Sequence, residues 1–256
     1  VDDSAFMRKS ISMMLESDPD IKVVATGRDG KDGIEKIKQF KPDLVTLDVE
    51  MPNMDGLTAL GIIMKEMPLP VLMISSITTE GAAATIEALS LGAADFISKD
   101  MSYVSLEISK IKEELVAKVK HITASRAAQF RAHRVRTETS TGKPQVRPVS
   151  ATISSRVTPR RATQDLKAVV LGISTGGPFA LLQMLPKLPA AFPLGIAIVQ
   201  HMPPNFTKSM AERLDSQCQL EVREAKEGDR MQPGLVLIAP GGRHMTFARR
   251  GMNRQR

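Results

Sequence analysis

Short apolar runs alternate with helical stripes along most of the chain, and no other feature restricts the fold as strongly. Between the runs, apolar residues recur at helical spacing, as at Leu181, Met184, Leu185 and Leu188. Strands that are apolar throughout are typical of parallel sheets buried on both faces. The sequence therefore predicts an α/β protein with doubly wound parallel sheets, whose strands we place at residues 21–25, 44–47, 71–74, 95–97, 169–171, 195–199, 220–224 and 235–239.

This rhythm is interrupted in the middle of the chain. A length of 256 residues is itself typical of two domains. Residues 137–164 are rich in Ser, Thr, Pro and Arg and show no apolar period, so they cannot bury enough surface to fold alone. We expect one domain over residues 1–105, a helix extension and a flexible basic linker over 106–164, and a second, incomplete domain over 165–256.

The net charge of +7 is concentrated in the middle segment. Eleven Lys or Arg residues and one acid, Glu138, lie between positions 118 and 161, so this segment carries +10 and the remainder −3. A basic segment can bind nucleic acid, but no DNA- or RNA-binding motif accompanies it. A solvated linker explains the charge, and we do not expect a nucleic-acid partner.

The composition also bears on where the protein works. No apolar run approaches the roughly 18–20 residues that span a bilayer, and the single cysteine, Cys218, cannot form an intramolecular disulfide. We therefore expect a cytoplasmic protein that is not inserted into a membrane. The chain starts at Val1 without a full first strand and stops at Arg256 without a closing element, so we expect a fragment truncated at both ends.

Polar side chains follow the predicted strands of the first domain where each strand ends. The carboxyl ends of parallel strands meet at one edge of a sheet and form its ligand site. Clustered carboxylates repel one another unless a cation lies among them, and their oxygens suit Mg²⁺. A carboxylate in that setting can attack a phosphoryl donor. Each residue alone could be a cap or a surface charge, but four strand ends agree, at Asp2 with Asp3, at Asp48, at Ser75 and at Lys99.

A Gly-x-Ser174-x-Gly motif stands between a predicted strand and a helix in the second domain. A serine on such a turn exposes a nucleophilic hydroxyl, and the N–H groups of the new helix could hold an oxyanion. The motif alone is weak, because a Gly-rich turn explains it equally well. His201 ends the next strand and could act as general base. The acid that would orient the imidazole is not identifiable, although Asp215 and Asp229 are available.

Four stretches of the first domain carry a family resemblance: Val-Asp-Asp-Ser, Leu-Asp48-Val-Glu-Met-Pro-Asn-Met-Asp-Gly56, Met-Ile-Ser75-Ser and Gly92-Ala-Ala-Asp-Phe96-Ile-Ser-Lys99. Over residues 1 to about 105 the chain resembles the receiver domain of two-component response regulators, which implies a flavodoxin-like fold. It departs from most receivers at Lys99-Asp100, where they have Lys-Pro.

The receiver resemblance implies that Asp48 is the phosphoacceptor and that a sensor histidine kinase is the phosphodonor. It implies that Mg²⁺ is held by Asp3, Asp48 and the main-chain carbonyl of Glu50, with Asp2 acting through water. Three more residues would respond to the phosphoryl group, namely the hydroxyl of Ser75, the switching aromatic Phe96 and the phosphate partner Lys99.

Residues 166–256 carry Gly-Ile-Ser174-Thr-Gly-Gly-Pro, Val-Gln-His201-Met-Pro-Pro-Asn-Phe, Ala-Lys-Glu-Gly-Asp229 and Ile-Ala-Pro-Gly-Gly-Arg-His-Met245. They resemble the catalytic domain of the chemotaxis protein-glutamate methylesterase family, with a Rossmann-like fold. The resemblance implies Ser174 as nucleophile, His201 as base and the Thr175 N–H as an oxyanion donor. It also implies that the catalytic Asp falls beyond Arg256.

Together these resemblances predict phosphorylation-activated hydrolysis of glutamate methyl esters, and deamidation of glutamines, on methyl-accepting chemotaxis receptors. The reaction would pass through an acyl-serine intermediate and need no cofactor. Phosphorylation of Asp48 would free Ser174 from a covering receiver, and the chain as given would be a weak or inactive esterase. The alternative is a phosphorylation-regulated binding module whose second domain is catalytically inert.

Overall fold

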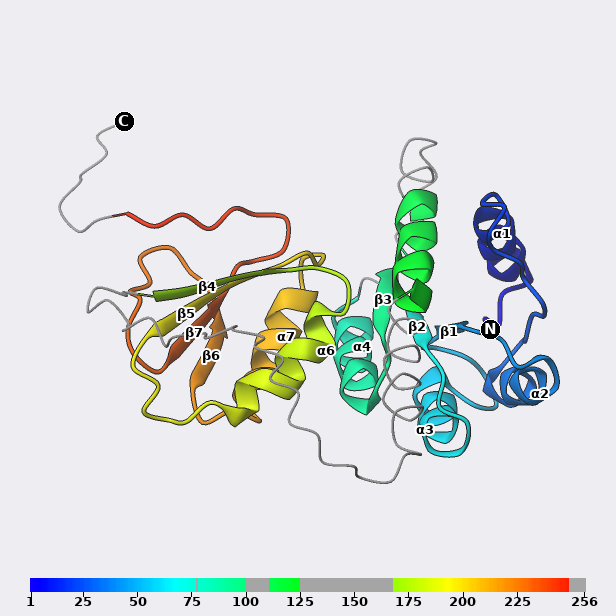
Figure 1. The fold of residues 1–256 in the computed structure, drawn as a ribbon, viewed down its shortest axis with the longest axis horizontal. Helices are drawn as coiled ribbons and strands as arrows, with labels where there is room; N and C mark the ends of the chain where they lie inside the picture. The colour runs from blue at the N-terminus through cyan, green and yellow to red at the C-terminus, as the bar shows by residue number, and fades with distance from the viewer. Residues whose placement is uncertain (77, 100–110, 125–167, 249–256) are drawn as a thin grey trace, which may run out of the picture.

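The computed structural model describes residues 1–76, 78–99, 111–124 and 168–248, which form two units built on separate sheets (Figure 1). The first sheet contains β1 (Val45–Asp48), β2 (Val71–Ser75) and β3 (Asp95–Ser98) in that order, and all three strands are parallel. Its strands lie where the apolar runs predicted them, within a residue at each end.

A polar side chain caps the N-terminus of each of the first four helices. A cap oxygen accepts a hydrogen bond from a free N–H of the first turn and stabilises a helix by about 1 kcal/mol. The helices α1 (Ala5–Leu15), α2 (Gly30–Phe40), α3 (Gly56–Glu66) and α4 (Thr79–Leu91) are capped in turn by Ser4, Asp29, Asp55 and Thr78. The α4 helix ends at Gly92, whose φ of 113° lies in the left-handed region that glycine tolerates.

Helices cover both faces of the first sheet, as a doubly wound fold requires. On β2, Leu72 and Ile74 belong to a buried cluster formed with α1 and with the helix of residues 111–124. Val71 and Met73 alternate with them and belong to the cluster formed with α2, α3 and α4. Since successive strand residues point to opposite faces, one continuous apolar run supplies both layers. Residues 111–124, in the predicted helix extension, thus pack on the first unit.

The predicted strand at residues 21–25 is not a strand in the structure, and this prediction was wrong. A strand forms only beside a hydrogen-bonded neighbour. Val1 lies between this stretch and β1 and pairs with β1. Its amino group donates to Thr46 O at 2.7 Å, and its carbonyl oxygen accepts from Asp48 N at 3.0 Å. Residues 21–27 themselves receive one hydrogen bond from this segment, from Asp2 N to Gly27 O at 3.1 Å. A single bond does not make a strand ladder.

The second sheet contains β4 (Ala168–Ile173), β5 (Gly195–Gln200), β6 (Glu221–Glu224) and β7 (Leu235–Ile238), in the spatial order β4-β5-β7-β6 and all parallel. The prediction of parallel-sheet α/β domains is therefore confirmed.

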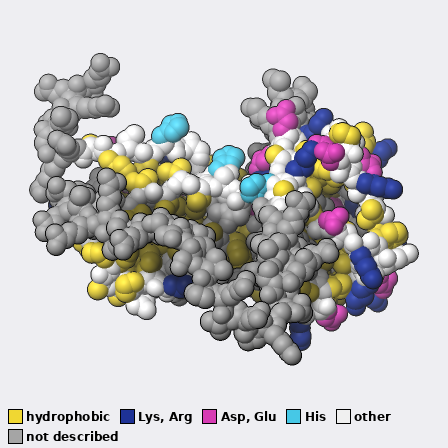
Figure 2. Space-filling view, viewed as in Figure 1, with side chains coloured by type: hydrophobic (Ala, Val, Ile, Leu, Met, Phe, Trp, Pro, Cys, Tyr) yellow, Lys and Arg dark blue, Asp and Glu magenta, His cyan; other side chains and the backbone are white. Residues whose placement is uncertain are grey.

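Two helices pack on one face of that sheet, α6 (Gly177–Met184), which continues as a 3₁₀ turn (Leu185–Lys187), and α7 (Phe206–Asp215). On the face seen in Figure 2, this unit exposes more hydrophobic side chains to solvent than the first unit does, whereas charged side chains gather on the first unit. Val170 and Val199, on neighbouring strands β4 and β5, are 63% and 46% exposed.

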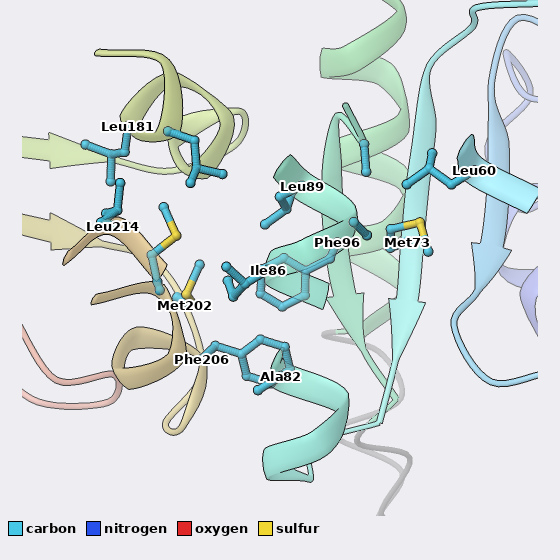
Figure 3. Packing of buried hydrophobic residues seen from close by; sticks show 14 of the residues in the cluster. Leu60, Met73, Ala82, Ile86, Leu89, Phe96, Leu181, Met202, Phe206 and Leu214 are labelled. Atoms are coloured by element: carbon cyan, nitrogen blue, oxygen red, sulfur yellow. The ribbon is translucent and has the colours of Figure 1, made fainter. Parts of the chain in front are cut away.

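The two units meet through α4 and α7, and their buried side chains form one continuous cluster (Figure 3). At its centre the ring of Phe96, on β3, stacks on the ring of Phe206, the first residue of α7. The ring centroids are 4.7 Å apart and the planes are inclined by 11°. Arg213 Nε donates to Ser90 Oγ at 3.3 Å at the edge of the contact. Full burial of a phenylalanine contributes about 2–3 kcal/mol, so Phe206 is a major anchor of this interface.

Two glycines of α3 are expected to respond oppositely to alanine. A methyl group at Gly56 would overlap the carbonyl oxygen of Asp48, whereas one at Gly61 would meet nothing within 4 Å. Gly56→Ala should therefore destabilise the first unit by about 1–3 kcal/mol, and Gly61→Ala should stabilise it by about 0.4–1 kcal/mol. Urea denaturation of both variants measures the difference, and equal effects would refute the close approach at Gly56.

Candidate functional sites

Three carboxylates, those of Asp2, Asp3 and Asp48, meet at the carboxyl end of β1. Each offers an oxygen atom, and these atoms lie within 4.8 Å of one another. Asp2 and Asp48 are each 1% exposed, whereas Asp3 is exposed and lines a surface hollow that also includes Glu50. Like charges this close and this deeply buried repel one another, so the cluster favours positive partners.

Lys99 directly follows β3 and supplies one positive charge. Its Nζ lies 2.5 Å from Oδ2 of Asp48 and 3.3 Å from Oδ2 of Asp2. Burial raises the pKa of Asp48, and the hydrogen bond and charge of Lys99 oppose this only in part. For Lys99 itself, burial works against the charged form, but the hydrogen bond and charge of Asp48 outweigh it, so the pKa of Lys99 is raised. The fold therefore favours the charged form of Lys99 and disfavours the ionised form of Asp48.

The donor atoms of this cluster fit a divalent cation. Oδ2 of Asp2 is buried, and its charged partner among the described residues is the Lys99 ammonium at 3.3 Å, which leaves this oxygen with capacity to bind an ion as well. The N–H of Glu50 donates to Oδ1 of Asp48 at 3.4 Å, which brings the backbone of Glu50 beside the carboxylates. Carboxylate and carbonyl oxygens are the ligands that Mg²⁺ prefers. Asp2, Asp3 and Asp48, with the Glu50 backbone, could therefore hold Mg²⁺.

Ser75 and Phe96, the two remaining receiver predictions, make contacts elsewhere. The Ser75 hydroxyl, fully buried, donates to Gly81 O in the first turn of α4 at 3.0 Å. Within the described residues no hydrogen bond joins it to Asp48. The Phe96 ring stacks on Phe206 in the second unit. Ser75 is thus bound to α4, and Phe96 lies in the domain interface.

Ser174 and His201 directly follow neighbouring strands of the second sheet. The parallel pairing of β4 and β5 ends with Ile173 opposite Gln200, and the N–H of His201 then donates to Ile173 O at 3.1 Å. Both side chains are exposed. Over residues 168–248 no hydrogen bond joins the Ser174 hydroxyl to the imidazole, and in free enzymes such bonds are often long until substrate binds. The two residues predicted as nucleophile and base are therefore brought together at one sheet edge.

The turn after Ser174 has the strand–turn–helix shape that its glycines suggest. Gly176 adopts a φ of 74°, in the left-handed region, and α6 begins at the next residue with Pro178 in its first turn. Thr175 lies inside the turn, and its N–H makes no hydrogen bond to the described residues. That N–H is free to donate to a ligand beside Ser174.

The two acids that the sequence leaves available make hydrogen bonds to groups other than His201. Oδ1 of Asp215 accepts from Val222 N at 2.8 Å. Oδ2 of Asp229 accepts from Arg223 Nη1 at 2.6 Å and from the N–H of Lys226, and these bonds lower the pKa of Asp229. Among the described residues the structure identifies no orienting acid.

Sequence reasoning missed two residues that contact these sites. Nε2 of Gln200 donates to the carbonyl oxygens of Ser174 and His201, at 3.1 and 3.2 Å. Nζ of Lys118 donates to Phe96 O at 2.8 Å and lies 5.4 Å from the centroid of its ring. A polar residue at the end of an apolar strand was a signal for Gln200. Nothing in the sequence singles out Lys118 from the other lysines of its helix.

Known proteins match both units of this chain. Residues 1–109 match the family model of the response regulator receiver domain, and residues 169–256 match that of CheB methylesterase. Protein-glutamate methylesterase/protein-glutamine glutaminase 1 of Oleidesulfovibrio alaskensis is 51% identical over 265 residues, covering 96% of this chain and 69% of that protein. The chain belongs to this methylesterase family.

A second curated relative agrees with that membership. The methylesterase/glutaminase of Symbiobacterium thermophilum is 49% identical over 251 residues, covering 98% of this chain and 68% of that protein. The solved receiver domain of Thermotoga maritima CheB is 47% identical, with a TM-score of 0.44, and the match covers 48% of this chain and 92% of that one. The alternative of a binding module is not favoured, because both the receiver and the methylesterase are matched. No helix of the described residues is long and apolar enough to cross a bilayer.

Asp48→Asn is expected to make this methylesterase chain more stable at neutral pH in magnesium-free buffer. The raised pKa means that the folded state holds the ionised carboxylate less well than the unfolded chain does, even with Lys99 beside it. This penalty is absent below the ordinary Asp pKa of about 3.9 and develops as pH rises through the folded pKa. The advantage of the variant should therefore grow from pH 4 to pH 7.

Urea denaturation at both pH values measures this advantage. Asp43→Asn, on an exposed aspartate of the same unit, is the matched control and should show no such trend. A variant that is less stable than the parent at pH 7 would contradict the burial cost at Asp48.

Proposed function

We propose that this chain hydrolyses glutamate γ-methyl esters, and deamidates glutamine side chains, on chemotaxis receptors. The observation that supports this most is the placement of Ser174 and His201 at adjacent strand ends, in a chain 51% identical to a named methylesterase/glutaminase. A hydroxyl and an imidazole at neighbouring strand ends, with a free N–H at Thr175, suit acyl transfer.

The proposed reaction is a double displacement at Ser174. Its Oγ attacks the ester carbonyl carbon while His201 takes the hydroxyl proton, and the Thr175 N–H donates to the oxyanion. The bond to the methoxy oxygen breaks, and His201 returns the proton so that methanol leaves. His201 then deprotonates a water that attacks the acyl-serine, which releases the glutamate side chain and restores Ser174. With a glutamine substrate, ammonia leaves in place of methanol.

We further propose that Asp48 is the phosphoacceptor of the receiver unit. Its carboxylate would attack the phosphorus of a phosphohistidine on a sensor kinase, the P–N bond would break, and Asp48 would carry an acyl phosphate. Mg²⁺ held by Asp3, Asp48 and the Glu50 carbonyl, with Asp2 acting through water, would neutralise phosphoryl charge. Lys99, 2.5 Å from Asp48, is placed to donate to a phosphoryl oxygen. We also propose a cytoplasmic location, where these partners would be met.

Regulation would pass from Asp48 to the second unit through α4 and Phe96. A phosphoryl oxygen is a stronger acceptor than Gly81 O for the Ser75 hydroxyl, so phosphorylation would release that bond from the first turn of α4. The α4 helix packs on α6 and α7, the helices that follow Ser174 and His201. Because Ser174 and His201 are exposed to water in this arrangement, the receiver would hinder a protein substrate rather than water.

Ser174→Ala is expected to abolish methanol release from methylated receptor, with a loss on the order of 10⁴–10⁶-fold in kcat by analogy with other serine hydrolases. Ser216→Ala is the matched control, because that hydroxyl only donates to Arg213 O on the surface of α7. Methanol is quantified with and without a small phosphodonor. Methanol release by the Ser174 variant at the parent's rate would show that Ser174 is not the nucleophile.

Phe206→Leu is expected to raise the basal esterase rate about 2–10-fold and to shrink the stimulation by phosphodonor. The variant stays apolar but loses a ring stack worth about 0.5–1.5 kcal/mol. If the two units are mostly closed, losing that energy raises the open population about 2–10-fold. Phe179→Leu, on a phenylalanine of α6 that is 40% exposed, is the control. A Phe206 variant with the parent's basal rate and stimulation would show that the stack does not hold the units closed.

A further inference from the structure

Gln200, the last residue of β5, joins the backbones of the two residues proposed to react. Only 6% of it is exposed. Its Nε2 donates to the carbonyl oxygen of Ser174 at 3.1 Å and to that of His201 at 3.2 Å. A side-chain amide carries two N–H donors, and both are used in this bridge.

The other end of the amide fits against the start of α6. Oε1 of Gln200 is buried and accepts no hydrogen bond from the described residues. It lies against Gly177, where a methyl group would overlap it. The N–H of Gly177 also donates to the carbonyl of Ser174 at 2.8 Å. Glycine is therefore required at the two positions for different reasons. Gly176 adopts the left-handed conformation of the turn, and Gly177 leaves room for the Gln200 side chain.

We propose that Gln200 is a positioning residue for acyl transfer, which fixes the Ser174 backbone relative to His201. This inference rests on the proposed roles of those two residues. The last backbone bond between β4 and β5 runs from His201 N to Ile173 O at 3.1 Å. Beyond that bond no ladder sets the separation of the two strand ends, and the Gln200 amide supplies the tie.

The tie matters because proton transfer is sensitive to distance. A general base must come within about 2.6–3.2 Å of the hydroxyl that it deprotonates, and a misplacement of about 1 Å can cost 100-fold in rate. A buried amide oxygen without a hydrogen bond destabilises the folded state. The two hydrogen bonds donated by the same amide give Gln200 a role that offsets this cost.

Gln200→Met tests this proposal, because it keeps the length of the side chain and removes both donors. With methylated receptor and phosphodonor, we expect kcat of the full chain to fall about 10–100-fold while KM changes less than about twofold. Gln183→Met, on an exposed glutamine of α6, is the matched control and should leave both constants unchanged. Gly177→Ala should reproduce the fall in kcat, since it displaces the amide without removing its donors.

The possible results have different consequences for the two proposals. If Gln200→Met keeps the parent's kcat, or raises KM alone, the positioning role is refuted. Thermal unfolding and Asp48 phosphorylation check that each variant is folded, and if Gln200→Met does not fold, Gly177→Ala decides by the same criteria. Ser174→Ala is measured alongside: if it retains methanol release, the proposed function itself fails. If it abolishes release while Gln200→Met is fully active, only the role of Gln200 fails.

Discussion

Parallel pairing of neighbouring strands is the constraint on which both candidate sites depend. Parallel strands end at the same edge of a sheet, so residues that follow them become neighbours although the sequence separates them widely. In the second sheet the register that sets Ile173 opposite Gln200 delivers Ser174 and His201 to one edge. In the first sheet the same rule brings Asp48, at the end of β1, within reach of Lys99, just past β3. Pairing that slipped by one residue would turn these side chains to the wrong face.

The two sites concentrate polar groups that folding alone disfavours. Burial raises the pKa of Asp48, and Oδ2 of Asp2 and Oε1 of Gln200 are buried without hydrogen bonds from the described residues. The apolar layers of the sheets offset these costs, since strand residues such as Leu47 and Met73 are almost wholly buried. One further buried oxygen of the described residues, Oδ2 of Asp95, lacks a hydrogen bond, and it lies at the start of β3, 3.2 Å from Nζ of Lys118. Two of the three such atoms therefore lie at the strand edges that carry the candidate sites.

The periodicity of the sequence was enough to place the strands and the edge residues, because burial on both faces demands continuous apolar runs. It failed at residues 21–25, where an apolar run alone was read as a strand although pairing also requires a neighbour on the ladder. It marked Gln200 only as a polar residue at the end of an apolar strand and did not mark Lys118, because the contacts of both follow from distances across the fold. The stack of Phe96 on Phe206 joins two domains, and no local signal in either domain specifies its partner.

That stack also explains how two separate chemistries can be coupled. Phe96 lies on β3, whose end leads to Lys99, while Phe206 opens the helix that follows the His201 loop. Lys118 holds Phe96 by its carbonyl oxygen and lies over its ring, so the aromatic cannot shift without breaking a charged contact. A ring stack changes a two-state equilibrium by roughly 2–10-fold, which is too little for an all-or-none switch. In the proposed regulation the packing of α4 on α7 would therefore carry the rest of the coupling, and the bond from Ser75 to the first turn of α4 would be the contact through which phosphorylation of Asp48 acts on it.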